Sequence, residues 1–148
     1  MARNGPFDEL SELLLVQGIT PTLYPALSEL FTPLSGPGVN VNTASAQVLQ
    51  LIPVIDENIA QAIIQRRAGP DGLDGTADDT PFRNLAEISW LPGIPPGALQ
   101  QFTGRFTTRS LVFEVKVETR IGDETRTFVA LLRRVNTRDL VLLNLHWE

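Results

Sequence analysis

Two stretches of this chain, residues 6–21 and 81–96, align on each other without a gap. Both begin with Pro-Phe, carry Leu and Glu at the same offsets, and close with Gly-Ile followed by a proline two residues later. An internal repeat of this kind indicates a duplicated structural unit. Each copy is predicted to form a short helix ending at Gly18 or Gly93, because glycine suits the left-handed backbone of a helix C-cap. The closing proline of each copy is expected in the first turn of the next helix.

The region between the two copies contains two predicted helices. Asn42 and Thr43 are good N-cap residues for the first, because their side chains accept hydrogen bonds from the free amides of a first helical turn. The second helix is expected from residue 56 or 57 to Arg67, where Arg67 and the arginine before it complement the helix dipole. Helical spacing predicts an inward face made of Ile59, Ala60, Ile63 and Ile64.

The hydrophobic period changes in the last third of the chain. Alternation over residues 111–118 predicts a half-buried strand, and further strands are expected over 125–134 and 139–147. The chain is therefore predicted to be an α+β protein, with a helical domain over residues 1–104 and an antiparallel β meander over residues 105–148. Three strands need a partner on their apolar face, so either the helices or a further segment of chain are expected to cover it.

Composition removes several chemistries from consideration. The chain has no cysteine and a single histidine, His146. It therefore has almost no residues from which thiol nucleophiles, disulfides, histidine-based triads or metal clusters could be built. The net charge of −5 is opposite in sign to that of a phosphate-backbone binder. No stretch reaches the roughly 20 apolar residues that span a bilayer, and the first residues lack the apolar core of a signal peptide. Either the protein is cytosolic or a further segment precedes this chain, and the second is the expectation.

An acidic, glycine-rich segment over residues 69–80 follows the second predicted helix. Calcium binds about six to eight oxygen ligands, and glycines let a loop curl so that carboxylates converge. The segment does not match the regular calcium-loop pattern, and Asp-Gly pairs are also ordinary turn formers. A calcium site and an ion-free surface loop therefore both stay open. A metal hydrolase built on this loop is disfavoured, because the segment has neither a histidine nor an evident nucleophile. The candidate calcium ligands are Asp71, Asp74, Asp78 and Asp79.

The segment Val39–Ile52, together with its two helices, resembles the helix-hairpin-helix unit of DNA-uptake proteins. In that unit a Gly-Ile-Gly hairpin offers backbone amides to phosphates. The corresponding hairpin here, residues 53–57, reads Pro-Val-Ile-Asp-Glu. Proline removes an amide donor, and the two carboxylates repel phosphate. A helix-hairpin-helix DNA-binding module is therefore the alternative function, ranked behind a structural role.

Taken in order along the chain, the motifs resemble the K family of minor pseudopilins of the type II secretion system. The resemblance covers nearly the whole chain. It implies a pseudopilin-type β-sheet combined with an inserted helical domain of duplicated helix-hairpin-helix-like units. The motifs are Pro-Phe-x-x-Leu-x-Glu-Leu at 6–13, Val-Asn-Val-Asn-Thr-Ala at 39–44, a helix ending in Arg-Arg at 59–67, Pro-Phe-x-x-Leu-x-Glu at 81–87, and strands over 106–147 that close near a tryptophan.

The same resemblance implies a role and partners. It predicts a non-enzymatic tip subunit of the secretion pseudopilus, which assists protein export across the outer membrane. The expected partners are minor pseudopilins of the I and J types, with secreted proteins and the outer-membrane channel as further candidates and no nucleic acid. A hydrophobic N-terminal helix, preceding the residues present here, is expected to anchor the protein in the inner membrane of a Gram-negative bacterium. The domain itself would then be periplasmic.

Overall fold

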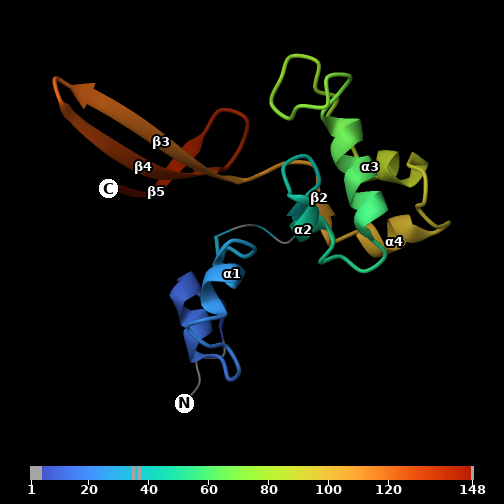
Figure 1. The fold of residues 1–148 in the computed structure, drawn as a ribbon, viewed down its shortest axis with the longest axis horizontal. Coiled ribbons are helices and arrows are strands. Elements are labelled where there is room, and N and C mark those ends of the chain that lie inside the picture. Colours follow the sequence, from blue (N-terminus) through green and yellow to red (C-terminus); the bar gives the residue numbers. More distant parts are fainter. Residues whose placement is uncertain (1–4, 35, 37, 148) are drawn as a thin grey trace. The chain divides into compact units, whose positions relative to one another are not determined.

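The computed structural model describes residues 5–34, 36 and 38–147, which form two units divided after Arg109. Figure 1 shows helices up to the division and an antiparallel meander after it. The predicted α+β class, with small helical hairpins and an antiparallel sheet, is confirmed. No helix within the described residues is long and apolar enough to cross a membrane.

The two repeat copies fold alike, as a 3₁₀ helix followed by a short α-helix. The first copy contains η1 (Leu10–Leu15) and leads into α1 (Tyr24–Ser28), and the second contains η2 (Leu85–Trp90) and leads into α4 (Ala98–Phe102). The expected short helices are present as 3₁₀ helices, a form that proteins use in short pieces. Each 3₁₀ helix ends three residues before the glycine, Gly18 or Gly93, at which the helix was expected to end.

The repeat glycines nevertheless adopt the left-handed conformation, with φ of 96° at Gly18 and 86° at Gly93. The closing prolines lie outside the following helices, which corrects the sequence expectation. The first turn of α1 contains Pro25 instead, and α4 begins after Gly97, another left-handed residue with φ of 81°.

Between the copies lie β1 (Val39–Asn40), α2 (Ala46–Leu49) and α3 (Glu57–Arg67). The α3 helix has the predicted extent, and the Asp56 carboxylate caps it by accepting a 2.8 Å hydrogen bond from the Ile59 amide. Ser45, not Asn42 or Thr43, caps α2. The Asn42 side chain is engaged in tertiary hydrogen bonds: it donates to the carbonyls of Phe82 and Thr108 and accepts from the Phe82 amide.

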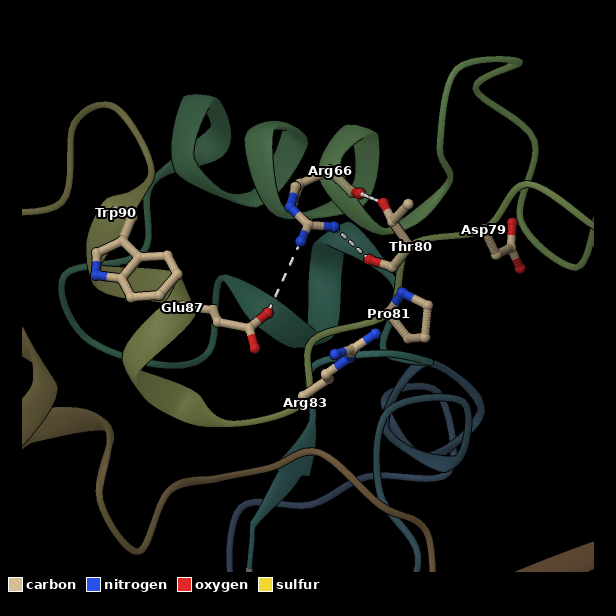
Figure 2. Close-up of a pocket in the computed structure, with 7 residues that line it drawn as sticks. All are labelled: Arg66, Asp79, Thr80, Pro81, Arg83, Glu87 and Trp90. Atoms are coloured by element: carbon tan, nitrogen blue, oxygen red, sulfur yellow. Dashed lines mark hydrogen bonds and ion pairs between the residues drawn. The ribbon is translucent and has the colours of Figure 1, made fainter.

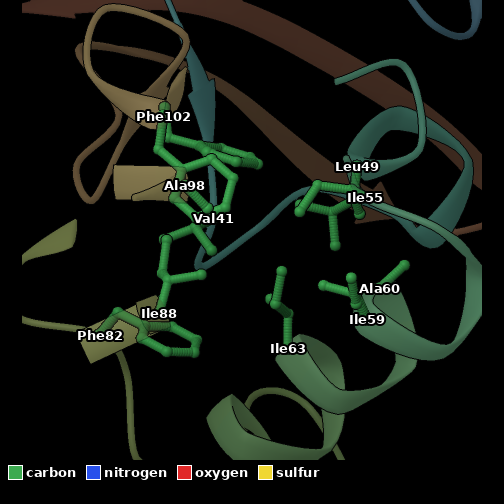
Figure 3. Close-up of a cluster of buried hydrophobic side chains, with 11 residues drawn as sticks. Val41, Leu49, Ile55, Ile59, Ala60, Ile63, Phe82, Ile88, Ala98 and Phe102 are labelled. Atoms are coloured by element: carbon green, nitrogen blue, oxygen red, sulfur yellow. The ribbon is translucent and has the colours of Figure 1, made fainter. Parts of the chain in front are cut away.

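The core of the first unit forms where the second repeat copy packs with α2 and α3. Ile88 of η2 and Phe102 of α4 are fully buried, and the predicted inward face of α3 lies against them. The first copy differs, because neither η1 nor α1 has a buried residue. Figure 3 shows the cluster, whose buried members are Val41, Leu49, Ile55, Ile59, Ala60, Ile63, Phe82, Ile88, Ala98, Phe102 and Phe106.

The β2 strand (Phe106–Thr107) belongs to the first unit, because it pairs in parallel with β1. Residues 105–109, which the sequence analysis assigned to the meander, therefore lie with the helices. The second unit is an antiparallel sheet in the order β3 (Val112–Ile121), β4 (Glu124–Arg134) and β5 (Leu140–Trp147).

Candidate functional site

One face of the second unit is apolar across all three strands. Successive side chains of a strand alternate between faces, and directly paired residues share a face. The observed register therefore aligns Val117 with Phe128 and Trp147, and Val115 with Ala130 and Leu145. We call this set the apolar face: Phe113, Val115, Val117, Phe128, Ala130, Leu132, Leu142, Leu145 and Trp147.

Two side-chain contacts agree with this assignment. The rings of Phe128 and Trp147 meet edge to face with centroids 6.1 Å apart. The Arg134 guanidinium lies 4.8 Å from the centre of the Phe113 ring. The apolar face is nevertheless open to solvent, because Leu142, Leu145 and Trp147 are 54%, 58% and 77% exposed.

The opposite face carries Glu114, Lys116 and Glu118 along β3, so the sheet is amphipathic. His146 lies on this face opposite Val129, exposed on the edge strand. Among the described residues of the second unit, Val129 alone is buried. A sheet with one buried side chain lacks a core of its own, so the apolar face is the surface on which this unit needs a partner.

The acidic segment 69–80 forms a closed loop at the end of α3. The Arg66 guanidinium donates to the Thr80 carbonyl, and the Thr80 hydroxyl donates to the Arg66 carbonyl. The Thr80 amide adds a 2.8 Å hydrogen bond to the Arg67 carbonyl. Gly69 makes the closure possible, because a Cβ at this position would lie 2.2 Å from the Asp78 carbonyl oxygen.

Arg67 organises the loop in a way that the sequence analysis missed. Its side chain is buried, and Nη1 donates to the carbonyls of Val41 and Ala44 at 2.9 and 2.8 Å. Nε and Nη2 donate to the two carboxylate oxygens of Asp74 at 3.1 and 2.6 Å. These hydrogen bonds, together with the positive charge of Arg67, hold the pKa of Asp74 below its ordinary value.

The remaining candidate ligands accept hydrogen bonds from the loop itself. Asp78 accepts from the Thr76 hydroxyl at 2.7 Å and from the Asp71 amide at 3.0 Å, and these bonds lower the pKa of Asp78. Asp79 accepts from the Gly75 amide at 2.8 Å. Asp71 accepts from the amide of Leu73, also at 2.8 Å.

Whether this loop fits a calcium ion depends on the hydrogen bonds that its four aspartates already accept. Within the described residues, no three acidic or histidine side chains converge as metal ligands. Asp74 in particular already has a charged partner. The four aspartates therefore share a loop without forming a coordination shell in this geometry, and calcium binding by Asp71, Asp74, Asp78 and Asp79 stays a prediction.

The hairpin between α2 and α3 contains a strained residue. Val54 has φ of 84°, in the left-handed region that β-branched residues strongly avoid. Its neighbour Ile55 is buried in the core, and Asp56 caps α3. The hairpin thus places a valine side chain at a left-handed position that glycine would occupy without strain.

A pocket of about 380 Å³ lies beside the acidic loop, lined in part by Arg66, Arg83, Glu87 and Trp90. Figure 2 shows Trp90 at one end and Asp79 at the other, with the Asp79 carboxylate turned away from the arginines. Arg66 lies 3.7 Å from Glu87 and stacks over the Phe82 ring at 5.4 Å. Trp90 is 78% exposed and therefore lies outside the core.

Comparisons with known proteins agree with this architecture. The helix-hairpin-helix motif family matches residues 35–107, a little under half of the chain. A chain in the crystal structure of the GspK-GspI-GspJ complex from the enterotoxigenic Escherichia coli type 2 secretion system resembles this protein with a TM-score of 0.64 and 17% sequence identity. The superposition covers 98% of this chain and 49% of that chain, so this protein spans about half the length of the one it resembles. No curated protein sequence matches significantly.

At this level of identity the likeness establishes the fold. The chain has an α+β pseudopilin-like fold that contains a helix-hairpin-helix-type motif.

Proposed function

We propose that this protein is a minor pseudopilin, a structural subunit at the tip of a type II secretion pseudopilus that assists protein export across the outer membrane. The observation that carries the proposal is the likeness over 98% of the chain to a subunit of a minor pseudopilin complex. The order of motifs described above supports the K family in particular. The role is one of assembly, without catalysis.

The apolar face gives the proposal a physical basis. Among the described residues of the sheet, one side chain is buried. The sheet therefore gains stability when an apolar helix covers its apolar face. Burying an exposed leucine such as Leu145 contributes about 1.5–3 kcal/mol. In the proposed assembly this helix is the N-terminal hydrophobic helix of the subunit or of a neighbour. The partners are minor pseudopilins of the I and J types, with secreted proteins or the outer-membrane channel as further contacts.

The helical unit supports a position at the tip. Subunits of a filament stack beneath one another, and a bulky head clashes with a subunit placed above it. The first unit extends to Arg109 and is therefore much larger than the sheet unit. We infer that it caps the filament from the periplasmic side, while the N-terminal helix anchors the subunit in the inner membrane before assembly.

Co-purification tests the assembly role. We expect the chain, joined to its native N-terminal helix, to co-purify with I- and J-type minor pseudopilins of the same organism. Leu145→Asp on the apolar face should abolish this association. Lys116→Glu, which changes a charge on the opposite face, should retain it. Failure of the wild type to associate with either partner would refute the proposal.

DNA binding is the alternative that the helix-hairpin-helix match raises. Its hairpin contains Pro53, which has no amide donor, and Val54, whose side chain occupies the approach that phosphate needs. The chain also carries a net charge of −5. A mobility shift of duplex DNA that weakens with salt, produced by the purified chain, would favour this alternative.

A further inference from the structure

The pocket beside the acidic loop combines an exposed indole with an unpaired positive charge. Trp90 is 78% exposed at the end of η2. Arg83 is exposed and, within the described residues, makes no hydrogen bond or ion pair. Both line the same pocket of about 380 Å³.

The other charged groups of the pocket are already satisfied. Glu87 accepts from the Asn84 side chain at 3.1 Å and lies 3.7 Å from Arg66, so this acid and this base neutralise each other. Asp79 accepts hydrogen bonds from Gly75 and Thr76 in the acidic loop, and Figure 2 shows its carboxylate pointing out of the pocket. The charge left for a ligand is that of the Arg83 guanidinium.

The repeat offers an internal comparison. Leu15 occupies the position of Trp90 in the first copy and is also exposed, at 85%. Asp8 occupies the position of Arg83, so the first copy carries a carboxylate where the second carries a guanidinium. The combination of a large apolar side chain and a free cation therefore distinguishes the second copy.

We propose that the pocket lined by Arg83, Glu87 and Trp90 binds a segment of a partner protein that presents an aromatic or aliphatic side chain beside a carboxylate. Tryptophan and arginine are the residues most enriched at the energetic centres of protein interfaces. The indole supplies apolar contact area, and the guanidinium pairs with a carboxylate through two parallel hydrogen bonds. The inference uses the first unit alone and does not rest on the pseudopilus proposal.

Tryptophan fluorescence of the full chain tests the inference directly. The chain has two tryptophans, so Trp147→Phe makes Trp90 the only indole. The probe is a short capped peptide in which phenylalanine and glutamate alternate. We expect a saturable blue shift of the Trp90 emission, because the peptide displaces water from the indole. Added salt should weaken binding, since the pocket is open to solvent.

Matched variants and probes separate the outcomes. Arg83→Gln should weaken binding by about tenfold or more, the effect expected of an interface hot spot. Leu15→Ala, at the equivalent position of the first copy, should leave binding unchanged. Equal binding of a peptide with lysine in place of glutamate would overturn the inference, as would an unchanged affinity in Arg83→Gln. A response to single-stranded DNA with none to the peptide would assign the pocket to nucleic acid instead.

Discussion

The guanidinium of Arg67 holds both carboxylate oxygens of Asp74, at 3.1 and 2.6 Å, while its remaining nitrogen binds two backbone carbonyls. One buried side chain thus ties the end of α3 to the β1–α2 connection and to the acidic loop. Asp74 itself is half exposed. The pair therefore combines a buried cation with an anion that water partly screens.

We expect Asp74→Asn to lower the free energy of unfolding by about 1–2 kcal/mol at neutral pH. The lost partner leaves the buried charge of Arg67 without compensation, and the exposure of Asp74 reduces the cost below that of a fully buried pair. Urea unfolding measures the change. Asp123→Asn, in the exposed β3–β4 turn, is the control and should have little effect.

The same pair predicts a dependence of stability on pH. The pKa of Asp74 is lower in the folded chain than its ordinary value of 3.8, so the folded state favours the ionised form. The stabilisation is fully present above that ordinary value and is lost as the pH falls through the lowered pKa. Melting temperatures measured between neutral and acidic pH should fall less steeply in Asp74→Asn than in the wild type. Parallel curves would contradict the prediction.

Substitution of Gly69 should disrupt the closure of the acidic loop. Gly69 and Gly72 have nearly equal φ values, 69° and 71°, but only Gly69 has backbone within contact distance of an added Cβ. Gly72→Ala should therefore cost about 1–2 kcal/mol for the left-handed backbone alone. Gly69→Ala should cost a further 1–3 kcal/mol or so, because the loop must shift away from the Asp78 carbonyl. Equal unfolding free energies for the two variants would show that the close approach is unimportant.

Val54 provides a test of backbone strain. Val54→Ala removes side-chain packing but keeps a Cβ at φ of 84°, whereas Val54→Gly removes the Cβ as well. We expect Val54→Gly to be more stable than Val54→Ala by about 1 kcal/mol. This order is opposite to the one found at ordinary helix or strand positions, where glycine is the weaker residue. Thermal unfolding of both variants decides the sign.

Calcium binding is a separate prediction for the acidic loop. Asp78 and Asp79 would have to exchange amide and hydroxyl donors for the cation. Calcium at about 100 times its dissociation constant should then stabilise the folded chain by about 2.7 kcal/mol. Asp78→Asn should lose this increase, and Asp123→Asn should keep it. A melting temperature that neither calcium nor a chelator changes would show that the loop closes without an ion.

Local patterns in the sequence predicted the regular elements well. The spacing of Ile59, Ala60 and Ile63 was enough to predict α3, because this signal comes from neighbouring residues. Alternation predicted the first strand of the meander, β3, for the same reason. The boundary between the two units was harder to predict from the sequence, since Phe106 joins the first unit by pairing with Val39, which is far away in the sequence.

The residues that organise the candidate sites were harder to predict. Asn42 has the chemistry of an N-cap, but its side chain bonds to Phe82 and Thr108, and only the fold brings these together. Arg67 was predicted to complement the dipole of α3, and the neighbouring residues gave no indication that its side chain would be buried. Val54 carries no sequence signal for a left-handed backbone. For Asn42 and Arg67 a tertiary contact overrides the local preference.

The register shift between Leu131 and Leu132 gives β5 one unpaired residue, Leu143. Leu142 and Leu145 are an odd number of positions apart, so in a regular strand they would point to opposite sides of the sheet. The bulge reverses the alternation once and turns the last residues, including Trp147, toward the same side as Leu142. Deleting Leu143 would therefore leave a regular strand that still presents Leu142, Leu145 and Trp147 on one side, whereas regular pairing with Leu143 retained would turn the last residues onto the charged side.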